Sequence, residues 1–476
     1  MKARPVALLT AVVALLGLSA PAIAQHYQTD FPAEEFRARW EGVFDAIGDQ
    51  AVAVVQGINL TDGFIVPRQT NVFYYLTGIE TPGAYLLLDG RDRTAALYLP
   101  PRNERLERSE GKVLSADDAA LVIELTGVDR VLSAEAMRDD WPPALDRNTA
   151  IYAQFTPAEG QGQSRYELQQ ANAAIVDDPW DGRISREARF VELLRARHPR
   201  SEIRDLTPVT DALRSVKSER EVALIRRASE IAGYGMMEAM RSTEPGVWEY
   251  QLDAAMRYVF LINGSRHEGY RPITASGFEN MWNGHYWRSS RQAQAGDLIL
   301  MDYAPDYRYY TSDIGRVWPV DGSYEPWQRT LLQFILEYRN TVLDLIRPGV
   351  TVEEIYAEAA QRMLPVLEAT EFARPEHAAA AGRMLETGGG AMSHPVGLAV
   401  HDDGPYRAGP LQVGHVFSVD PQLWVPEEEL YLRYEDTVVV TEDGVENFTW
   451  FLPSELDEIE ALVREEGVVQ KVPAME

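Results

Sequence analysis

The chain has 476 residues, a formal net charge of −28 and no cysteine, with 45% hydrophobic and 25% charged residues. This length allows two or three domains and a large core, and the negative charge argues against nucleic acid and anionic membrane surfaces as partners. The lack of cysteine excludes thiol nucleophiles and cysteine-based zinc sites, so any metal must be held by Asp, Glu and His.

The first 24 residues have the three parts of a secretory signal peptide. Lys2 and Arg4 form a basic start, Ala7–Leu18 is largely apolar, and Ala22–Ala24 is a small-residue cleavage site. The apolar run is too short to span a membrane comfortably. We therefore expect an exported protein, periplasmic or secreted, whose mature chain starts at Gln25.

Residues 25–205 alternate helix and strand patterns, which predicts a first and smaller α/β domain. Residues 156–186 are rich in Gln, Ala and Gly and have few apolar anchors, so we expect a long exposed loop or an insertion there. The elements expected in this domain are a helix within 26–50 and strands at Ala51–Val55, Gly83–Leu88 and Thr94–Tyr98.

Residues 206–476 carry stronger helix signals, with the domain boundary near Arg204–Pro208. Ser218 and Glu221 form a capping box before a long apolar-periodic stretch, and a second helix is capped at Thr351. Further helices are expected at Trp248–Ile262, Trp327–Ile346 and Ser454–Arg464, and strands at 297–303, 309–319, 415–424 and 431–441. Helices on one side of a mostly antiparallel sheet make an α+β domain.

Two apolar runs within 297–319 flank a polar turn and carry one aspartate each, Asp302 and Asp313. If a hairpin turn centres on Tyr307 and Arg308, the two aspartates pair directly, with Cβ atoms roughly 5 Å apart. Two carboxylates this close are costly to bury without a cation. This stretch alone leaves two readings open: a metal site, or aspartates that turn outward or pair with an arginine.

Three more residues interrupt their local patterns. His394 lies in a glycine-rich stretch, and Asp420 and Glu435 each interrupt an apolar strand. Each has an ordinary explanation by itself, since a lone histidine near glycines is usually structural and a carboxylate in a strand often lies at the rim. Five such residues in one half of a chain favour a metal site with hard ligands.

The order of these residues resembles the pita-bread metallopeptidases, in particular Xaa-Pro aminopeptidase (aminopeptidase P) and prolidase. The matching segments are 300–302, 311–316, 393–404, 417–421 and 432–437. His285 lies where the family has a substrate-binding histidine, and Asn71–Leu88 resembles the family's N-terminal domain. The resemblance implies a pita-bread catalytic domain of the α+β class at 206–476, preceded by a smaller creatinase-like α/β domain at 25–205.

The resemblance also implies two divalent metal ions, most commonly Mn²⁺, with Co²⁺, Zn²⁺ and Fe²⁺ as alternatives. Asp302 would bind one metal, and Asp313 and Glu435 would bridge both. His394 and Asp420 would bind the other.

Four residues would carry the catalytic roles that the resemblance implies. Asp420 would shuttle a proton, His285 and His401 would hydrogen-bond the substrate, and Arg433 would fix Glu435 or a substrate group. Aromatic residues nearby would either wall a pocket for a proline ring or pack in the core: Trp282, Tyr286, Trp287, Tyr303, Tyr309 and Tyr310.

The expected function is an exported aminopeptidase that releases the first residue of peptides with proline second, and the resemblance implies a homo-oligomer, a dimer or tetramer. Two departures keep alternatives open: the family has Glu at Asp420, and a further His at Gly390. The alternatives are a prolidase acting on Xaa-Pro dipeptides, a creatinase-like hydrolase of a non-peptide C–N bond, and a non-catalytic binding relative.

Overall fold

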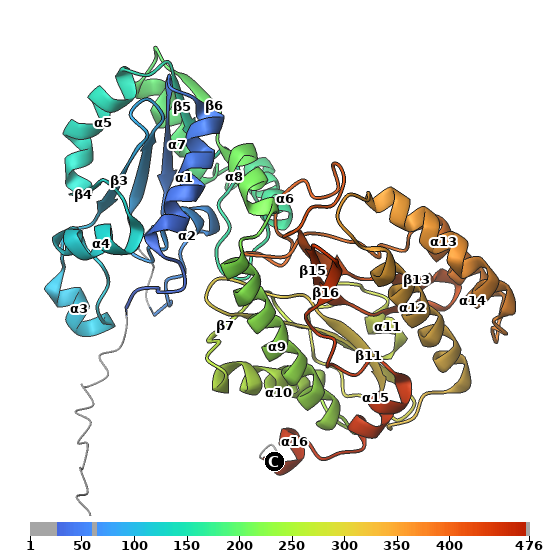
Figure 1. The fold of residues 1–476 in the computed structure, drawn as a ribbon. Coiled ribbons are helices and arrows are strands. Elements are labelled where there is room, and N and C mark those ends of the chain that lie inside the picture. Colours follow the sequence, from blue (N-terminus) through green and yellow to red (C-terminus); the bar gives the residue numbers. More distant parts are fainter. Residues whose placement is uncertain (1–25, 60–63, 473–476) are drawn as a thin grey trace, which may run out of the picture.

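The computed structural model describes residues 26–59 and 64–472, which form a smaller N-terminal part and a larger C-terminal part (Figure 1). The predicted signal peptide, residues 1–24, lies outside the described residues. Within the described ranges, no helix combines the length and the apolar character that crossing a bilayer requires.

A mixed six-stranded sheet organises the smaller part, in the order β4-β3-β2-β1-β5-β6. β1 pairs antiparallel with β2 and parallel with β5, and β3 pairs parallel with β4. The strands are β1 (Ala51–Gln56), β2 (Tyr85–Asp89), β3 (Thr94–Leu99), β4 (Arg130–Ser133), β5 (Ala150–Ala153) and β6 (Glu202–Asp205). The helices are α1 (Ala33–Ile47), α2 (Asn71–Thr77), α3 (Glu104–Glu110), η1 (Ala116–Asp118), α4 (Ala119–Thr126), η2 (Ala134–Ala136), α5 (Met137–Asp146), α6 (Arg165–Asp177) and α7 (Arg186–Arg197).

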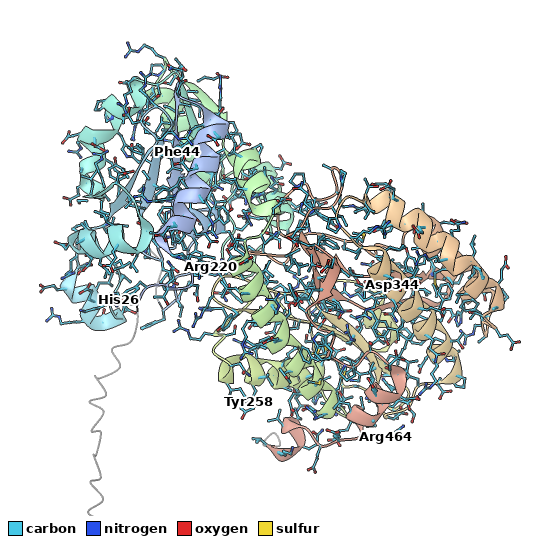
Figure 2. The ribbon with its side chains drawn as sticks, in the orientation of Figure 1. His26, Phe44, Arg220, Tyr258, Asp344 and Arg464 are labelled. Atoms are coloured by element: carbon cyan, nitrogen blue, oxygen red, sulfur yellow. The ribbon has the colours of Figure 1, made fainter. Side chains whose placement is uncertain are left out.

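Helices cover both faces of this sheet, and the alternation along β1 shows why. Val55 packs with Phe44 of α1 on one face, whereas Val54 packs with Leu194 of α7 on the other. Successive strand residues point to opposite faces, so a strand that is apolar throughout is buried on both. Phe44 lies in the interior of this part (Figure 2). The predicted α/β character is confirmed, and the boundary at 205/206 stays a prediction.

The expected loop at 156–186 is wrong in one respect, because it contains helix α6. The segment is anchored by charge rather than by apolar contacts: Arg165 Nε lies 2.6 Å from Glu159 Oε1, and its Nη1 lies 2.7 Å from Asp211 Oδ1. A third ion pair joins Arg165 Nη2 to Asp403 Oδ2 at 3.1 Å. Periodicity of apolar residues cannot reveal such anchors.

The larger part contains the long helices that the sequence predicts, and both capping boxes are present, at Ser218 and Thr351. The prediction omits α14, although one face of this helix is buried through Ala380, Ala381, Met384 and Leu385. The helices are α8 (Thr207–Ser215), α9 (Glu219–Arg241), α10 (Glu249–Ile262), α11 (Gly277–Met281), α12 (Pro326–Leu345), α13 (Val352–Ala369), α14 (Pro375–Thr387), η3 (Pro426–Glu428), α15 (Leu456–Val463) and α16 (Val468–Lys471).

Small antiparallel sheets lie between these helices (Figure 1), in the orders β11-β9-β8, β12-β15-β16, β13-β14 and β10-β7. Every strand pair in the described residues of this part is antiparallel, which confirms the α+β class. The strands are β7 (His267–Glu268), β8 (Ile273–Ser276), β9 (Leu298–Asp302), β10 (Pro305–Asp306), β11 (Gly315–Pro319), β12 (Val416–Val419), β13 (Gln422–Val425), β14 (Leu430–Arg433), β15 (Asp436–Thr441) and β16 (Gly444–Asn447).

The predicted pairing of Asp302 with Asp313 is wrong by two residues. Asp302 pairs with Gly315, because the connection from β9 to β11 is not a tight turn. It contains β10, which pairs with β7, and then Arg308 and Tyr309 in the left-handed region. A slip of two residues keeps a side chain on the same face of a sheet, so the error does not separate the two carboxylates.

Arg68 joins the two parts through a buried ion pair. Its Nε donates to Asp306 Oδ2 at 2.5 Å, and its Nη2 donates to the carbonyl oxygens of Tyr309 and Leu398 at 3.1 and 3.3 Å. Next to it, the rings of Tyr74 and Tyr309 stack with centroids 3.5 Å apart. The chain before β2 therefore holds two loops that lead to the central strands of the larger part.

We expect Arg68→Ala to destabilise the protein by about 3 kcal/mol, since removing one member of a buried ion pair leaves the other charge uncompensated. The shift of the urea midpoint, followed by tryptophan fluorescence, measures this loss. Arg105→Ala, on the exposed surface of α3, is the matched control. Equal midpoints for the two variants would contradict the structural role given to Arg68.

Candidate active site

A cavity of about 810 Å³ lies where the central strands of the larger part meet the N-terminal end of α6. The residues that the sequence singles out all line this cavity: His285, Asp302, Asp313, His394, His401, Asp420, Arg433 and Glu435. The structure thus brings all eight together, and their individual roles stay predictions.

Backbone pairing around Gly315 brings two of the carboxylates together. Gly315 N donates to Glu435 O at 3.1 Å, and Glu435 N donates back to Gly315 O at 3.0 Å. Asp302 pairs with the same glycine from β9. A Cβ at Gly315 would lie 3.2 Å from both Cβ and Oε2 of Glu435, so the close approach requires glycine.

The glycine-rich loop before β12 carries His394 to the cavity. It runs antiparallel to β12, with Ser418 N donating to His394 O at 2.9 Å and Asp420 N donating to Ala391 O at 3.0 Å. These bonds fix the register between the loop and the strand. His394 and Asp420 therefore reach the cavity from adjacent segments.

Asp302, Asp313 and Glu435 are buried and each offers an oxygen within 4.8 Å of the others. The Tyr270 hydroxyl lies 2.5 Å from Asp302 Oδ1 and 2.9 Å from Asp313 Oδ1. Burial, together with these carboxylates, raises the pKa of Tyr270, so the hydroxyl keeps its proton and donates it. Burial and then repulsion between carboxylates raise the pKa of Asp313 and of Glu435.

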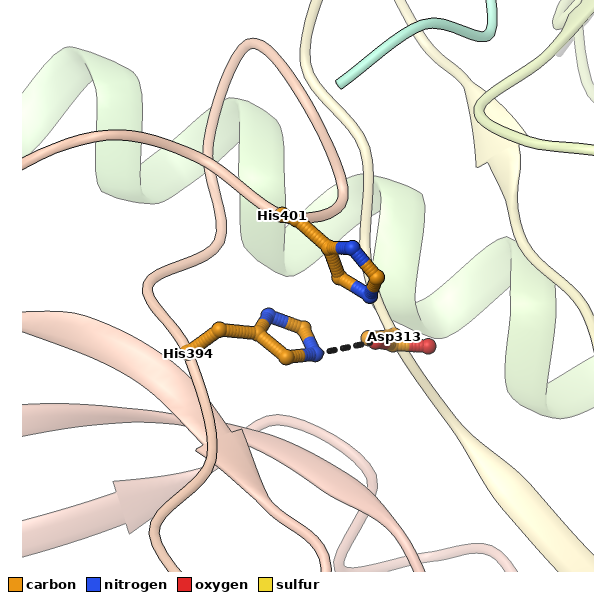
Figure 3. Close-up of side chains that lie close together, drawn as sticks. All are labelled: Asp313, His394 and His401. Carbon is orange, nitrogen blue, oxygen red and sulfur yellow. Dashed lines mark ion pairs between the residues drawn. The ribbon is translucent and has the colours of Figure 1, made fainter. Parts of the chain in front are cut away.

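The rings of His394 and His401 both lie close to the Asp313 carboxylate, as Figure 3 shows. His394 Nε2 lies 3.2 Å from Asp313 Oδ2, and its Nδ1 lies 3.2 Å from the carbonyl oxygen of Pro395. Burial, with His401 and Arg433 adding, lowers the pKa of His394 to about 3, so the ring is neutral. If Nδ1 donates to the carbonyl, the Nε2 lone pair faces a carboxylate oxygen. Two acceptors in contact need a cation or a proton between them.

Asp420 and Glu435 provide a direct test of whether this site suits a metal. Asp420 Oδ1 and Glu435 Oε2 are buried and have no hydrogen-bond partner in the part of the chain that the structure describes. An unpaired buried carboxylate oxygen is costly. Four carboxylates and an imidazole match divalent ions such as Mn²⁺ or Zn²⁺, so the residues fit a metal centre.

Arg433 and the two histidines at the cavity mouth are placed as follows. Arg433 Nη2 donates to Asp302 Oδ2, whereas its Nη1 lies 3.6 Å from Glu435 Oε2. The arginine thus hydrogen-bonds Asp302 and forms a longer ion pair with Glu435, and the role predicted for it toward Glu435 stays a prediction. His285 lies exposed at the rim, and its ring centroid is 6.0 Å from that of His401. His401 Nδ1 lies 3.0 Å from Glu167 Oε1 of α6.

Several residues of the site are missing from the sequence prediction. Ser418 of β12, whose hydroxyl donates to Glu435 Oε1 at 2.7 Å, and Gln422 of β13, which lines the cavity, each lie two residues from Asp420. In the single strand expected at 415–424, alternation would place all three on one face. That period of two could have found them. Tyr270 and Glu167 carry no such signal, because only the tertiary fold brings them to the cavity.

The expected aromatic pocket differs from the observed one. The aromatic residues lining the cavity among the described residues are Tyr270, Trp424 and Tyr431, and the rings of the last two stack with centroids 3.9 Å apart. Tyr303 and Tyr310 are buried in the core instead. The core alternative was correct for these two residues.

Two family models match the chain: Metallopeptidase family M24 at residues 223–442, and Aminopeptidase P, N-terminal domain at residues 36–152. The chain is 30% identical over 457 residues to an Xaa-Pro aminopeptidase of Escherichia coli, covering 91% of this chain and 98% of that one. It is 27% identical over 439 residues to Xaa-Pro aminopeptidase 3 of Homo sapiens, covering 87% and 81%. The structure of E. coli aminopeptidase P with the inhibitor Pro-Leu matches with a TM-score of 0.73, 27% identity and coverage of 91% and 99%.

A pita-bread fold that gathers carboxylates and imidazoles around one cavity defines a metallopeptidase, and this chain is a metallo-aminopeptidase. It belongs to the aminopeptidase P family. Members of this class hydrolyse a peptide bond with the help of divalent metal.

Gly315→Ala tests the close packing at the carboxylates. The added Cβ must displace Glu435 by a few tenths of an ångström, and we expect the affinity for Mn²⁺ to fall about tenfold, as when a metal ligand loses its orientation. Calorimetric titration of metal-stripped protein measures this. Gly409→Ala, where a Cβ meets nothing within 4 Å, is the control, and unchanged affinity in Gly315→Ala would contradict the packing argument.

Proposed function

We propose that the chain is an exported Xaa-Pro aminopeptidase that uses two divalent ions, Mn²⁺ first among them. The single observation that carries the proposal is the convergence of Asp302, Asp313, His394, Asp420 and Glu435 on one cavity. It is supported by 30% identity to an enzyme of that name over nearly the whole chain.

The ligand roles are those that the family resemblance implies, and the clustering of the three buried carboxylates supports them. Asp302 would serve one ion, whereas Asp313 and Glu435 would serve both. His394, with its Nε2 directed at Asp313, and Asp420, with Oδ1 unpartnered within the described chain, serve the other. When bound, such ions polarise a carbonyl and lower the pKa of water.

The other residues act on the substrate or on the ligands. Arg433 donates to Asp302 and holds its carboxylate in place. Tyr270 donates to Asp302 or Asp313 and limits their rotation. His285 and His401 reach the cavity mouth, where each can donate a hydrogen bond to a peptide carbonyl, and Asp420 is placed to move a proton to the leaving amine.

Export and assembly complete the proposal. The N-terminal 24 residues support cleavage before Gln25 and release to a periplasm or the medium, which N-terminal sequencing of the secreted protein would check. A homo-oligomer, a dimer or tetramer, is proposed from the resemblance, and light scattering after gel filtration would check it.

The decisive experiment uses the mature chain, stripped of metal and resupplied with Mn²⁺. We expect it to remove the first residue only, and only from peptides with proline second, as read by mass spectrometry. Xaa-Pro dipeptides in the same set separate a prolidase from an aminopeptidase. Cleavage irrespective of proline would contradict the specificity.

Asp313→Asn keeps the shape of the side chain but loses its charge. We expect this variant to lose about 10³-fold or more in turnover, because a carboxylate ligand that both ions share is gone.

Metal removal should have an effect that depends on pH. Because the folded protein without metal raises the pKa of Asp313, Asp420 and Glu435, the folded state binds more protons than the unfolded one. Its stability therefore falls as pH rises above the ordinary carboxyl pKa of about 4. Metal removes this penalty by pairing with the ionised groups.

We thus expect Mn²⁺ to raise the melting temperature more at pH 8 than at pH 5.5, measured by calorimetry with and without a chelator. Asp313→Asn should show a smaller difference between the two pH values. An equal rise at both pH values in the unmodified protein would contradict the raised pKa values of these carboxylates.

A further inference from the structure

Two departures from the family pattern, Asp420 and Gly390, meet at one side chain, Gln422. It is the first residue of β13 and lines the cavity next to both. Gln422 Nε2 donates to Asp420 Oδ2 at 2.5 Å. A Cβ built at Gly390 would lie 3.4 Å from Gln422 Cδ and 3.5 Å from its Nε2. The amide thus fills the space next to position 390 and holds the carboxylate at position 420.

The orientation of this amide is fixed by its neighbours. Trp424 Nε1, which can only donate, lies 3.3 Å from Gln422 Oε1. Asp420, when ionised, can only accept. The two contacts together determine which end of the amide carries the oxygen, and they leave Gln422 in one arrangement between the indole and the carboxylate.

The two oxygens of Asp420 consequently have different surroundings. Oδ2 accepts from Gln422 and lies 3.6 Å from Arg433 Nη1, whose strand residue pairs directly with Gln422. Oδ1 is buried without a partner among the residues described. Because the amide holds Oδ2, Oδ1 is the oxygen of Asp420 that is left available to a metal ion.

We infer that Gln422 is a positioning residue that adapts the metal centre to an aspartate at 420: its amide orients the shorter carboxylate so that Oδ1 serves as the ligand oxygen, and its side chain lies beside position 390. This inference rests on the proposed function. Groups that hydrogen-bond a ligand carboxylate fix its orientation, and their loss typically costs 10- to 100-fold in metal affinity.

The effect of a substitution at position 420 therefore depends on the side chain at position 422. A glutamate at 420 is one methylene longer, and its carboxylate would meet the Gln422 amide that now bonds Oδ2. Gly390 has φ of +71°, so any side chain there is strained, and its Cβ would lie in van der Waals contact with Gln422. A glutamate at 420 alone therefore conflicts with the amide.

The test compares four proteins in a double-mutant cycle: the unmodified mature chain, Gln422→Ala, Asp420→Glu, and the double variant. Affinity and stoichiometry for Mn²⁺ come from calorimetric titration of metal-stripped protein, and kcat and KM from cleavage of an Xaa-Pro peptide. Gln361→Ala, exposed on α13, is the matched control. Far-ultraviolet circular dichroism and the melting temperature of the metal-stripped forms check the fold.

We expect Gln422→Ala to bind its weaker Mn²⁺ 10- to 100-fold less tightly and to lose kcat with little change in KM. We expect Asp420→Glu alone to lose at least tenfold in kcat, and the double variant to regain most of that loss. Affinity in Gln422→Ala equal to that of the control, or additive effects in the double variant, would overturn the inference. Failure of the unmodified chain to bind Mn²⁺ would overturn the proposed function, and this inference with it.

Discussion

The structure depends on a concentration of negative charge that the protein cannot balance with its own cations. Asp302, Asp313, Asp420 and Glu435 are all buried around a single guanidinium, that of Arg433. Burying unpaired carboxylates is strongly unfavourable. The raised pKa values of three of them show the same imbalance. Divalent ions offset this negative charge, so a need for metal follows from the charge of the cavity before any reaction step is considered.

The four carboxylates repel one another, and the small antiparallel sheets hold their backbone in place against this repulsion. Glu435 is tied through two backbone bonds to Gly315, which pairs with Asp302. Next to it, Asp436 is fully buried and bonded to Arg316 and Arg339. Although burial raises it, these two arginines lower the pKa of Asp436 below its usual value, so this carboxylate stays ionised and structural. Glu435 and Asp436 are adjacent in the sequence, yet the pKa of Glu435 is raised and that of Asp436 is lowered.

The sequence was informative where a side chain conflicted with its local pattern. Asp302, Asp420 and Glu435 each interrupt an apolar strand, and each is buried in the cavity wall. The pairing partner of Asp302 was mistaken, yet both aspartates still meet at Tyr270, because a register error of two residues preserves the face. Local sequence patterns thus predict which residues are buried and which face of a strand they occupy, but they predict the lengths of the connecting loops poorly.

Contacts made between distant segments left no trace in those patterns. Alternation along the expected strand places Gln422 beside Asp420, but it does not show that the amide bonds this carboxylate or that it lies next to Gly390. Tyr270 reaches two aspartates from a short irregular stretch. Hydrophobic periodicity cannot predict such contacts, because they depend on how the sheets pack against one another.

The smaller part contributes to the cavity through contacts of this sort, made between segments that are distant in the sequence. Residues of α6 and the turn before it line the same cavity as the carboxylates, and Ser164 Oγ accepts the backbone N–H of His401 at 3.2 Å. Arg165, the next residue, is paired with Asp403 of the catalytic half. Asp402 in turn is held by Arg214 and Lys217 in a fully buried cluster. The loop that carries His401 is therefore fixed from both halves of the chain, so the N-terminal part is a wall of the active site, and the cavity that receives a peptide cannot be assigned to either half alone.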